Sequence, residues 1–219
     1  MQNNYKKAAV IFGFIVIVAG AYLIFARPSD NSSPTTGANS TSTDATMTSA
    51  GTPSSADGAS QPGATQPGMT AYSSNTLGLG FQYPKSYALG GTAAAPTFSS
   101  SEKVYTYPQS VITVTRVSNS SASYKQVLMN SVTYDASGML PKAFSEFSQQ
   151  KMGGNTYYRI QNGLFEGTLT VTYFLVNSRG IYEFQLHSLG VDWTNPKFNL
   201  EKQPGIVVLK QILPTVWVK

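Results

Sequence analysis

The residues that could do chemistry are few and well separated along this chain. His187 is the single histidine among 219 residues, and there is no cysteine. From Ala71 onward the seven Asp and Glu residues are isolated from one another in sequence. A metal site needs several such ligands in close array, and disulfides and thiol catalysis need cysteine. We therefore expect no metal site, no cofactor and no disulfide.

A serine nucleophile is the other chemistry to consider, because Ser-x-x-Lys occurs twice. The copies run from Ser100 to Lys103 and from Ser148 to Lys151. Serine acyltransferases place this motif at the start of a helix, where Lys meets Ser across one turn. The second copy lies in a predicted strand, where positions three apart face opposite sides, and the first lies in a loop. The sequence therefore predicts no catalytic residue.

The clearest structural signal is "TLTVTYFLVNSRGIYEFQL", in which two β-rich runs meet at residues 177–180. This pattern predicts a hairpin. If Val176 pairs with Ile181, one face of the hairpin is wholly apolar, and a one-residue slip would mix the two faces. The other face then carries polar residues at Thr170, Thr172, Glu183, Gln185 and His187. That face is either a ligand-binding surface or, more simply, the solvent side of a half-buried sheet.

Further strands and helices frame this hairpin. Gly153-Gly154 predicts a second hairpin, with Ser148 opposite Arg159 and Phe147 opposite Ile160. Strands are also expected at 77–84, ending at Pro84, and at 110–117, and helices at 121–132 and 204–213. Helices separated by antiparallel hairpins predict an α+β domain, an antiparallel β-sheet packed with helices.

One strand of the second hairpin also offers interface residues. Tyr157 and Tyr158 point to opposite faces, so one of them could remain outside for a partner. Arg159 follows them, and Tyr and Arg are favoured at interfaces. The predicted binding face is accordingly Arg159, Thr170, Thr172, Glu183, Gln185 and His187.

The N-terminal part predicts a membrane anchor. Residues 8–26 are nineteen uncharged, mostly apolar residues, enough for a helix of about 28 Å. Lys6 and Lys7 precede them and Arg27 follows, which places residues 1–7 in the cytoplasm and the C-terminal part outside it. Cleavage after Ala19-Gly20-Ala21 and the opposite orientation remain alternatives.

Residues 27–70 predict a disordered linker. From 28 onward they are Ser, Thr, Gly, Ala, Pro and other small or polar residues, apart from two methionines. Such a segment cannot bury enough apolar area to order itself, and its reach is roughly 35–40 Å. The folded domain is expected at 71–219. Its twelve Lys and Arg are scattered, so no nucleic-acid partner is expected.

The order of these parts resembles the PsbP-like family, whose founding members are extrinsic proteins of photosystem II. Membrane-anchored relatives occur in many bacteria. The matching segments are "NTLGLGFQYPKSY", "GGNTYYRI", "YFLVNSRGIYEFQL" and "IVVLKQILPTV" within residues 72–219. The resemblance implies an α/β/α sandwich, an antiparallel sheet between helices. Photosystem function does not follow from it, because one fold serves many functions.

We therefore expect a single-pass protein of the cell membrane that presents a non-catalytic, extracytoplasmic binding module. Its partner would be an envelope protein or a wall or lipid component. A structural or assembly factor that acts through its anchor is the alternative. An enzyme, with Glu183 and His187 as its most plausible site, is less favoured.

Overall fold

The computed structural model describes residues 64–117, 123–134, 138–165 and 167–219. The expected anchor at 8–26 and the expected linker up to residue 63 lie outside them. Among the described residues, no helix is long and apolar enough to cross a membrane. These residues form an antiparallel β-sheet domain with few helices, as expected for an α+β protein. Its first strand begins at Met69, two residues before the expected start of the domain.

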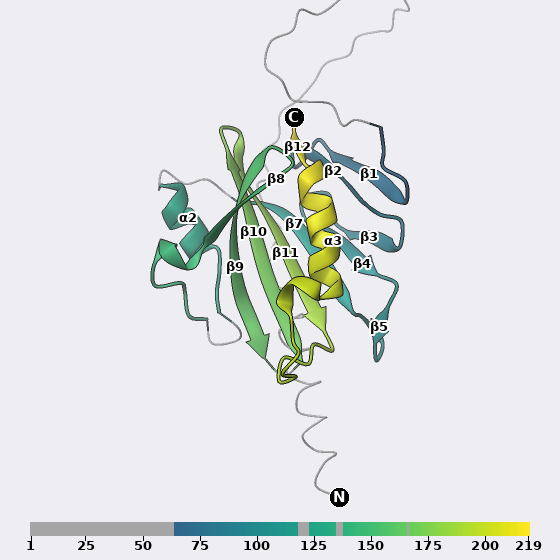
Figure 1. Ribbon diagram of the computed structural model, residues 1–219. Helices are drawn as coiled ribbons and strands as arrows, with labels where there is room; N and C mark the ends of the chain where they lie inside the picture. The colour runs from purple at the N-terminus through teal and green to yellow at the C-terminus, as the bar shows by residue number, and fades with distance from the viewer. Residues whose placement is uncertain (1–63, 118–122, 135–137, 166) are drawn as a thin grey trace, which may run out of the picture. The chain divides into compact units, whose positions relative to one another are not determined.

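The largest sheet has seven antiparallel strands in the order β3-β4-β7-β11-β10-β9-β8 (Figure 1). They are β3 (Tyr87–Gly91), β4 (Pro96–Ser100), β7 (Ser110–Val117), β8 (Ser148–Met152), β9 (Asn155–Phe165), β10 (Thr168–Asn177) and β11 (Gly180–Leu189). A smaller sheet has the order β1-β2-β12, and β5 pairs only with β6. These are β1 (Met69–Ser74), β2 (Leu79–Pro84), β12 (Trp217–Val218), β5 (Lys103–Val104) and β6 (Tyr107–Pro108).

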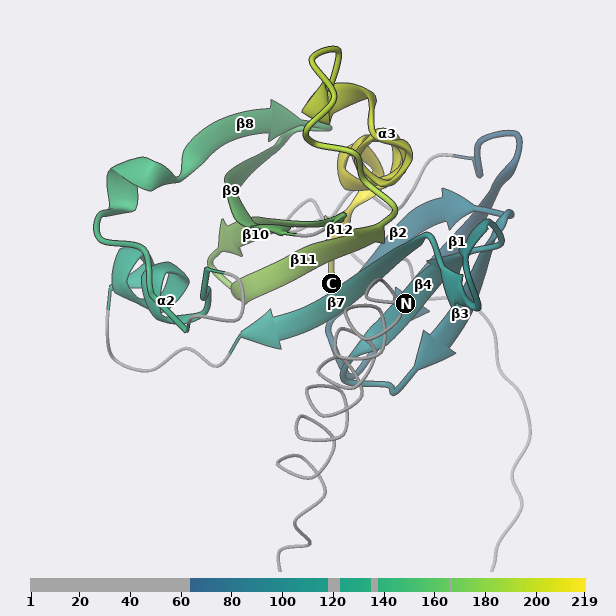
Figure 2. The same ribbon diagram turned by 90° about the horizontal axis from the view of Figure 1, so that it is seen from below.

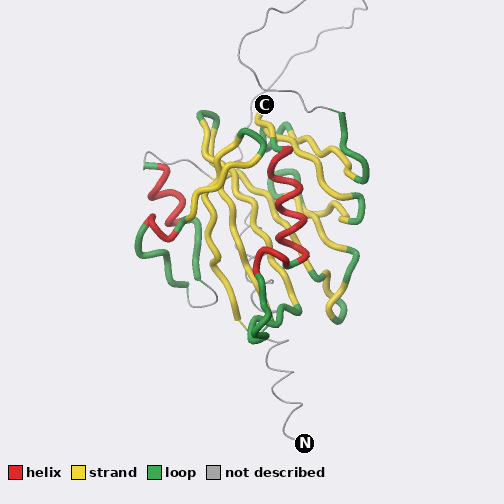
Figure 3. Tube along the Cα trace, in the orientation of Figure 1, coloured by secondary structure: helices red, strands yellow, loops and turns green. Residues whose placement is uncertain are grey.

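Helices are a small part of the described chain (Figure 3). The α-helices are α2 (Tyr124–Asn130) and α3 (Pro204–Ile212), and the 3₁₀ helices are η2 (Phe144–Glu146), η3 (Leu200–Lys202) and η4 (Leu213–Thr215). The Ser123 side chain caps α2 by accepting a hydrogen bond from the Gln126 amide. Pro204 occupies the first turn of α3, where a missing N–H costs nothing. Both helices were predicted, the first from a serine cap candidate with apolar residues at helical spacing and the second from Pro204.

The hairpin registers agree with the sequence patterns. Val176 pairs with Ile181, as the alternation of β10 and β11 requires. Ser148 pairs with Arg159 across the β8–β9 turn. In that turn Gly153 has φ +57°, and a Cβ there would lie 1.9 Å from the Pro214 carbonyl oxygen. Glycine is therefore required by both conformation and space.

The main core lies on one face of the seven-stranded sheet. Figures 1 and 2 show α3 running across this face. The helix contributes Ile206, Leu209 and Ile212, all fully buried. The smaller sheet closes the same core, since the Phe81 ring lies 5.1 Å from that of Phe98. The whole cluster is apolar or aromatic, so burial of this face supplies most of the hydrophobic stabilisation.

A second, smaller core lies on the opposite face. There α2 contributes Val127 and Leu128, which pack with sheet residues Ile160, Phe174 and Ile181. The hairpin's second face is thus not simply a solvent face, because α2 covers part of it. Phe174 and Thr172 are both completely buried. The remaining part of this face carries polar side chains.

Candidate functional site

The candidate site is this polar part of the α2-side face, formed by β11 and its neighbours. Five of the six predicted residues lie on it: Thr170, Thr172, Glu183, Gln185 and His187. A polar row crosses four strands, because Thr97 pairs with Thr113, Thr113 with Gln185, and Gln185 with Thr172. Except for the buried Thr172, the members of this row are half-buried.

Glu183 is the most perturbed group on this face. Its carboxylate accepts a hydrogen bond of 3.2 Å from the Thr115 hydroxyl on β7, and its cross-strand neighbour is the buried Phe174. Burial raises the pKa of Glu183 to about 7, and the Thr115 hydrogen bond opposes that shift. A carboxyl group that titrates near neutral pH can either donate or accept a hydrogen bond there.

His187 lies further along the same strand. Its Nδ1 is 3.1 Å from the Thr170 hydroxyl, and burial lowers the pKa of the imidazole. Glu183 and His187 are four residues apart on β11, so their Cα atoms are roughly 13 Å apart. At that separation the two groups cannot share a proton or contact one reacting atom. The arrangement suits hydrogen bonding to an extended ligand.

Thr172 is held by a residue that the sequence analysis did not identify. Its hydroxyl donates to the Asn162 side-chain oxygen at 3.0 Å, and the Asn162 amide donates to the Thr133 carbonyl at 3.3 Å. Asn162 is the extra residue of a β-bulge, because Thr170 pairs with Gly163 while the next residue of β10 pairs with Gln161. The adjacent Gly163 is the one local signal of this bulge.

Two further members of the face, Thr113 and Thr115, were also missed. They alternate with the buried Ile112 and Val114 along β7. That alternation is visible in the sequence and assigns both threonines to one face. What the sequence does not give is the neighbour of β7, which is β11.

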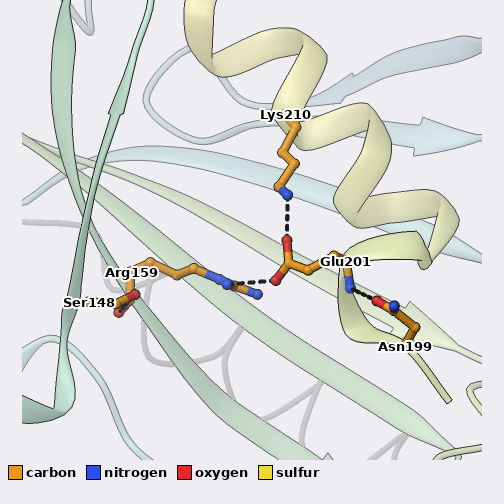
Figure 4. A network of polar contacts seen from close by, with 5 residues as sticks. All are labelled: Ser148, Arg159, Asn199, Glu201 and Lys210. Carbon is orange, nitrogen blue, oxygen red and sulfur yellow. Dashed lines mark hydrogen bonds and ion pairs between the residues drawn. The ribbon is translucent and has the colours of Figure 1, made fainter.

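Arg159 lies on the opposite face, so the structure corrects its inclusion in the binding face. It pairs with Tyr173, and its guanidinium carbon lies 5.6 Å from the centre of that ring. It forms a 2.8 Å ion pair with Glu201 of η3, which also pairs with Lys210 of α3 (Figure 4). Lys210 and then Arg159 hold the pKa of Glu201 below its usual value against a burial effect.

Neither adjacent tyrosine of β9 is left free for a partner. Tyr157 is fully buried, and its hydroxyl donates to the Leu213 carbonyl at 2.7 Å. Tyr158 is half-buried between the rings of Tyr124 and Phe144. Both therefore have structural contacts.

Within the described ranges, no group of three or more His, Asp or Glu residues could hold a metal ion. The polar face instead offers hydroxyls, the side-chain amides of Gln185 and Asn162, one imidazole and one carboxyl group. These groups can recognise a hydrogen-bonding ligand without a cofactor.

No family model and no curated protein matches this chain. Among solved structures, a crystal structure from Bacteroides thetaiotaomicron VPI-5482 is similar over 68% of this chain, with 12% sequence identity and a TM-score of 0.41. The match spans about half of that protein, 48% of its length.

Proposed function

We propose that this chain is a non-catalytic binding module, held outside the cytoplasmic membrane by residues 8–26, with an envelope protein or a wall or lipid component as its ligand. The observation that supports binding is the polar row of Thr97, Thr113, Gln185 and Thr172. It runs across the sheet, beside the Glu183–Thr115 pair, and belongs to neither apolar cluster. The location is proposed from the apolar segment and its flanking charges.

We also propose a PsbP-like α/β/α sandwich as the finer description of the fold. Its support is the position of the two helices on opposite faces of the antiparallel sheet. The α3 residues belong to the cluster on one face and the α2 residues to the cluster on the other. The order of segments in the sequence is the second support.

The test compares two full-length variants with the wild-type chain. Gln185→Arg places a bulky cation in the centre of the polar row, and Val207→Arg places one on the exposed side of α3, where Val207 is 42% exposed. Each tagged chain is solubilised in detergent and used to capture binders from envelopes of the source cell. Thermal unfolding of each variant checks that it is folded.

We expect one protein or wall fragment to be captured by the wild type and by Val207→Arg and to be lost with Gln185→Arg. Equal capture by all three folded chains would exclude the polar face as the binding surface. Replacing residues 8–26 with another apolar segment of equal length tests the assembly-factor alternative. A binding module should keep its activity after that exchange.

A further inference from the structure

The edge strand β3 is unusually open. It is the last strand of the seven-stranded sheet, and Ala88, Leu89, Gly90 and Gly91 are all exposed. Successive residues of a strand point to opposite faces, so both faces of β3 are accessible to solvent. Leu89 is 51% exposed, which is high for a leucine in a regular strand.

The backbone of β3 also presents unpaired groups along its outer edge. Thr92 and Ala95 exchange both backbone hydrogen bonds at the hairpin end, each 3.2 Å long. Paired residues of antiparallel strands alternate between hydrogen-bonded and non-hydrogen-bonded pairs. The Leu89–Phe98 pair is therefore non-hydrogen-bonded, and the Leu89 N–H and C=O point away from β4. No other group in the described part of the chain bonds to them.

The opposite edge of the sheet has features that discourage pairing. Strand β8 has the sequence Ser-Gln-Gln-Lys-Met, with the Lys151 side chain exposed. Charged side chains, Lys in particular, commonly protect sheet edges. By contrast, no charged residue occurs between Lys85 and Glu102, a run that contains the whole of β3 and β4.

We propose that β3 pairs with β3 of a second copy of this chain, in antiparallel orientation, and joins two sheets into one. A two-fold axis perpendicular to the sheet preserves its faces, so the pairing must be centred on a residue. Centring it on Leu89 uses the middle of β3, because the last residue of the strand, Gly91, has a left-handed φ of +77°. Leu89 then lies opposite its own equivalent, and Ala88 lies opposite Gly90.

The absence of charge is what favours a second copy over another partner. Symmetric pairing brings each side chain close to its own equivalent, so any charge near the centre would repel itself. An uncharged run of small and apolar residues avoids this penalty. The strand is only five residues long, so we expect a weak association that a covalent trap can capture.

Because the chain has no native cysteine, an introduced cysteine is its only thiol and any disulfide must involve that position. Full-length Leu89→Cys is expressed in cells, treated with a mild oxidant and analysed on a non-reducing gel. Opposed residues of a hydrogen-bonded antiparallel pair have Cα atoms about 5.5 Å apart, within disulfide range. We therefore expect a strong disulfide dimer that disappears on reduction.

Two control positions test the register and the edge. Ala88→Cys lies diagonally from its equivalent, about 7–8 Å away, and should cross-link several-fold less. Gln149→Cys, exposed on β8, should not cross-link. Equal cross-linking at all three positions would indicate random collision, and no cross-linking at Leu89→Cys would overturn the proposal. A mixed product with another protein would identify a heterologous strand instead and would equally overturn it.

Charge exchange gives a second test without cysteine. Leu89→Lys alone and Leu89→Glu alone should each abolish energy transfer between two copies that carry different fluorescent tags in the same cells, because each variant faces its own charge. Co-expression of the two variants should restore the energy transfer. Failure of this rescue while both variants remain folded would contradict a symmetric Leu89 pairing. The polar face is untouched, so this result is independent of the proposed function.

Discussion

The two faces of the seven-stranded sheet are built from the same strands but differ in polarity. On the α3 side, Tyr173, Phe184 and Leu186 are completely buried in one continuous apolar cluster. On the α2 side, the apolar cluster ends partway along β11, where Ile181 is followed by Glu183 and Gln185. Alternation along a strand lets one face carry the core while the other carries polar groups. Substitutions on the α3-side face should therefore change stability more than substitutions on the polar face, which is the proposed binding surface.

Substitutions at adjacent residues of β11 should show the largest difference in unfolding free energy between the two faces. Phe184→Ala removes a fully buried ring packed 5.9 Å from Phe81, and we expect it to cost about 3–5 kcal/mol of unfolding free energy. Gln185→Ala, half-buried on the other face, should cost less than about 1 kcal/mol. Urea denaturation of both full-length variants measures the difference. Similar losses would show that the polar face is also part of the core.

Much of this asymmetry was predictable from the sequence. Strict alternation in residues 168–189 has one register that separates apolar from polar side chains, and the structure has it. A serine cap candidate with apolar residues at helical spacing, and the proline at 204, likewise indicated both α-helices. These signals are local, so they can be recognised without knowing which strands become neighbours. The short strands β1, β3, β4 and β12 lack such patterns and were not identified.

The face of Arg159 shows why other features could not be predicted. Near the β9–β10 turn, Thr168 pairs with Phe165, and an uninterrupted ladder would have placed Arg159 opposite Phe174, on the polar face. The bulge at Asn162 inserts one residue and reverses the faces beyond it, so Arg159 lies opposite Tyr173 on the α3-side face and not opposite Phe174 on the α2-side face. A single unpaired residue therefore decides to which face Arg159 belongs. In the bulge, Asn162 is held by hydrogen bonds with the Thr172 hydroxyl and the Thr133 carbonyl, two groups that are distant from it in sequence.

The next largest effect concerns the carboxyl group of Glu183. Its pKa is about 7 in the folded chain, against 4.5 without burial. Between these values the folded state binds more protons than the unfolded state, so stability falls as pH rises from about 4.5 to 7. Glu183→Gln keeps an acceptor for Thr115 and removes the charge. We expect it to stabilise the chain by about 2–3 kcal/mol at pH 8 and to leave stability unchanged at pH 4.

Glu201 on the other face is the matched control, because its pKa is shifted in the opposite direction. Lys210 and Arg159 lower it, so its contribution is present above pH 4.5 and is lost as pH falls below that value. Glu201→Gln should be slightly destabilising at pH 8. Its unfolding free energy should also fall less than that of the wild type as the pH drops below 4.5. Thermal unfolding across pH 3–9 distinguishes the two profiles. Parallel profiles for both variants would contradict the assigned environments.

The smallest expected changes in stability concern two buried tyrosine hydroxyl groups in the α3-side core. Tyr157 and Tyr173 are both fully buried there, and burial raises the pKa of each, that of Tyr173 to about 12. The Tyr157 hydroxyl donates to the Leu213 carbonyl, whereas the Tyr173 hydroxyl has no hydrogen-bond partner among the described residues. Burying an unpaired hydroxyl costs about 1–3 kcal/mol, and losing a paired one costs about 1 kcal/mol.

Replacing each hydroxyl by hydrogen should therefore have opposite consequences. Tyr157→Phe should destabilise the chain by about 1 kcal/mol, and Tyr173→Phe should stabilise it by a similar amount. The guanidinium group of Arg159 still lies over the ring in Tyr173→Phe, so that contact is preserved. Urea denaturation of both variants at pH 7 measures the sign. Equal destabilisation would mean that the Tyr173 hydroxyl is paired in solution, for example by a water molecule between it and Arg159.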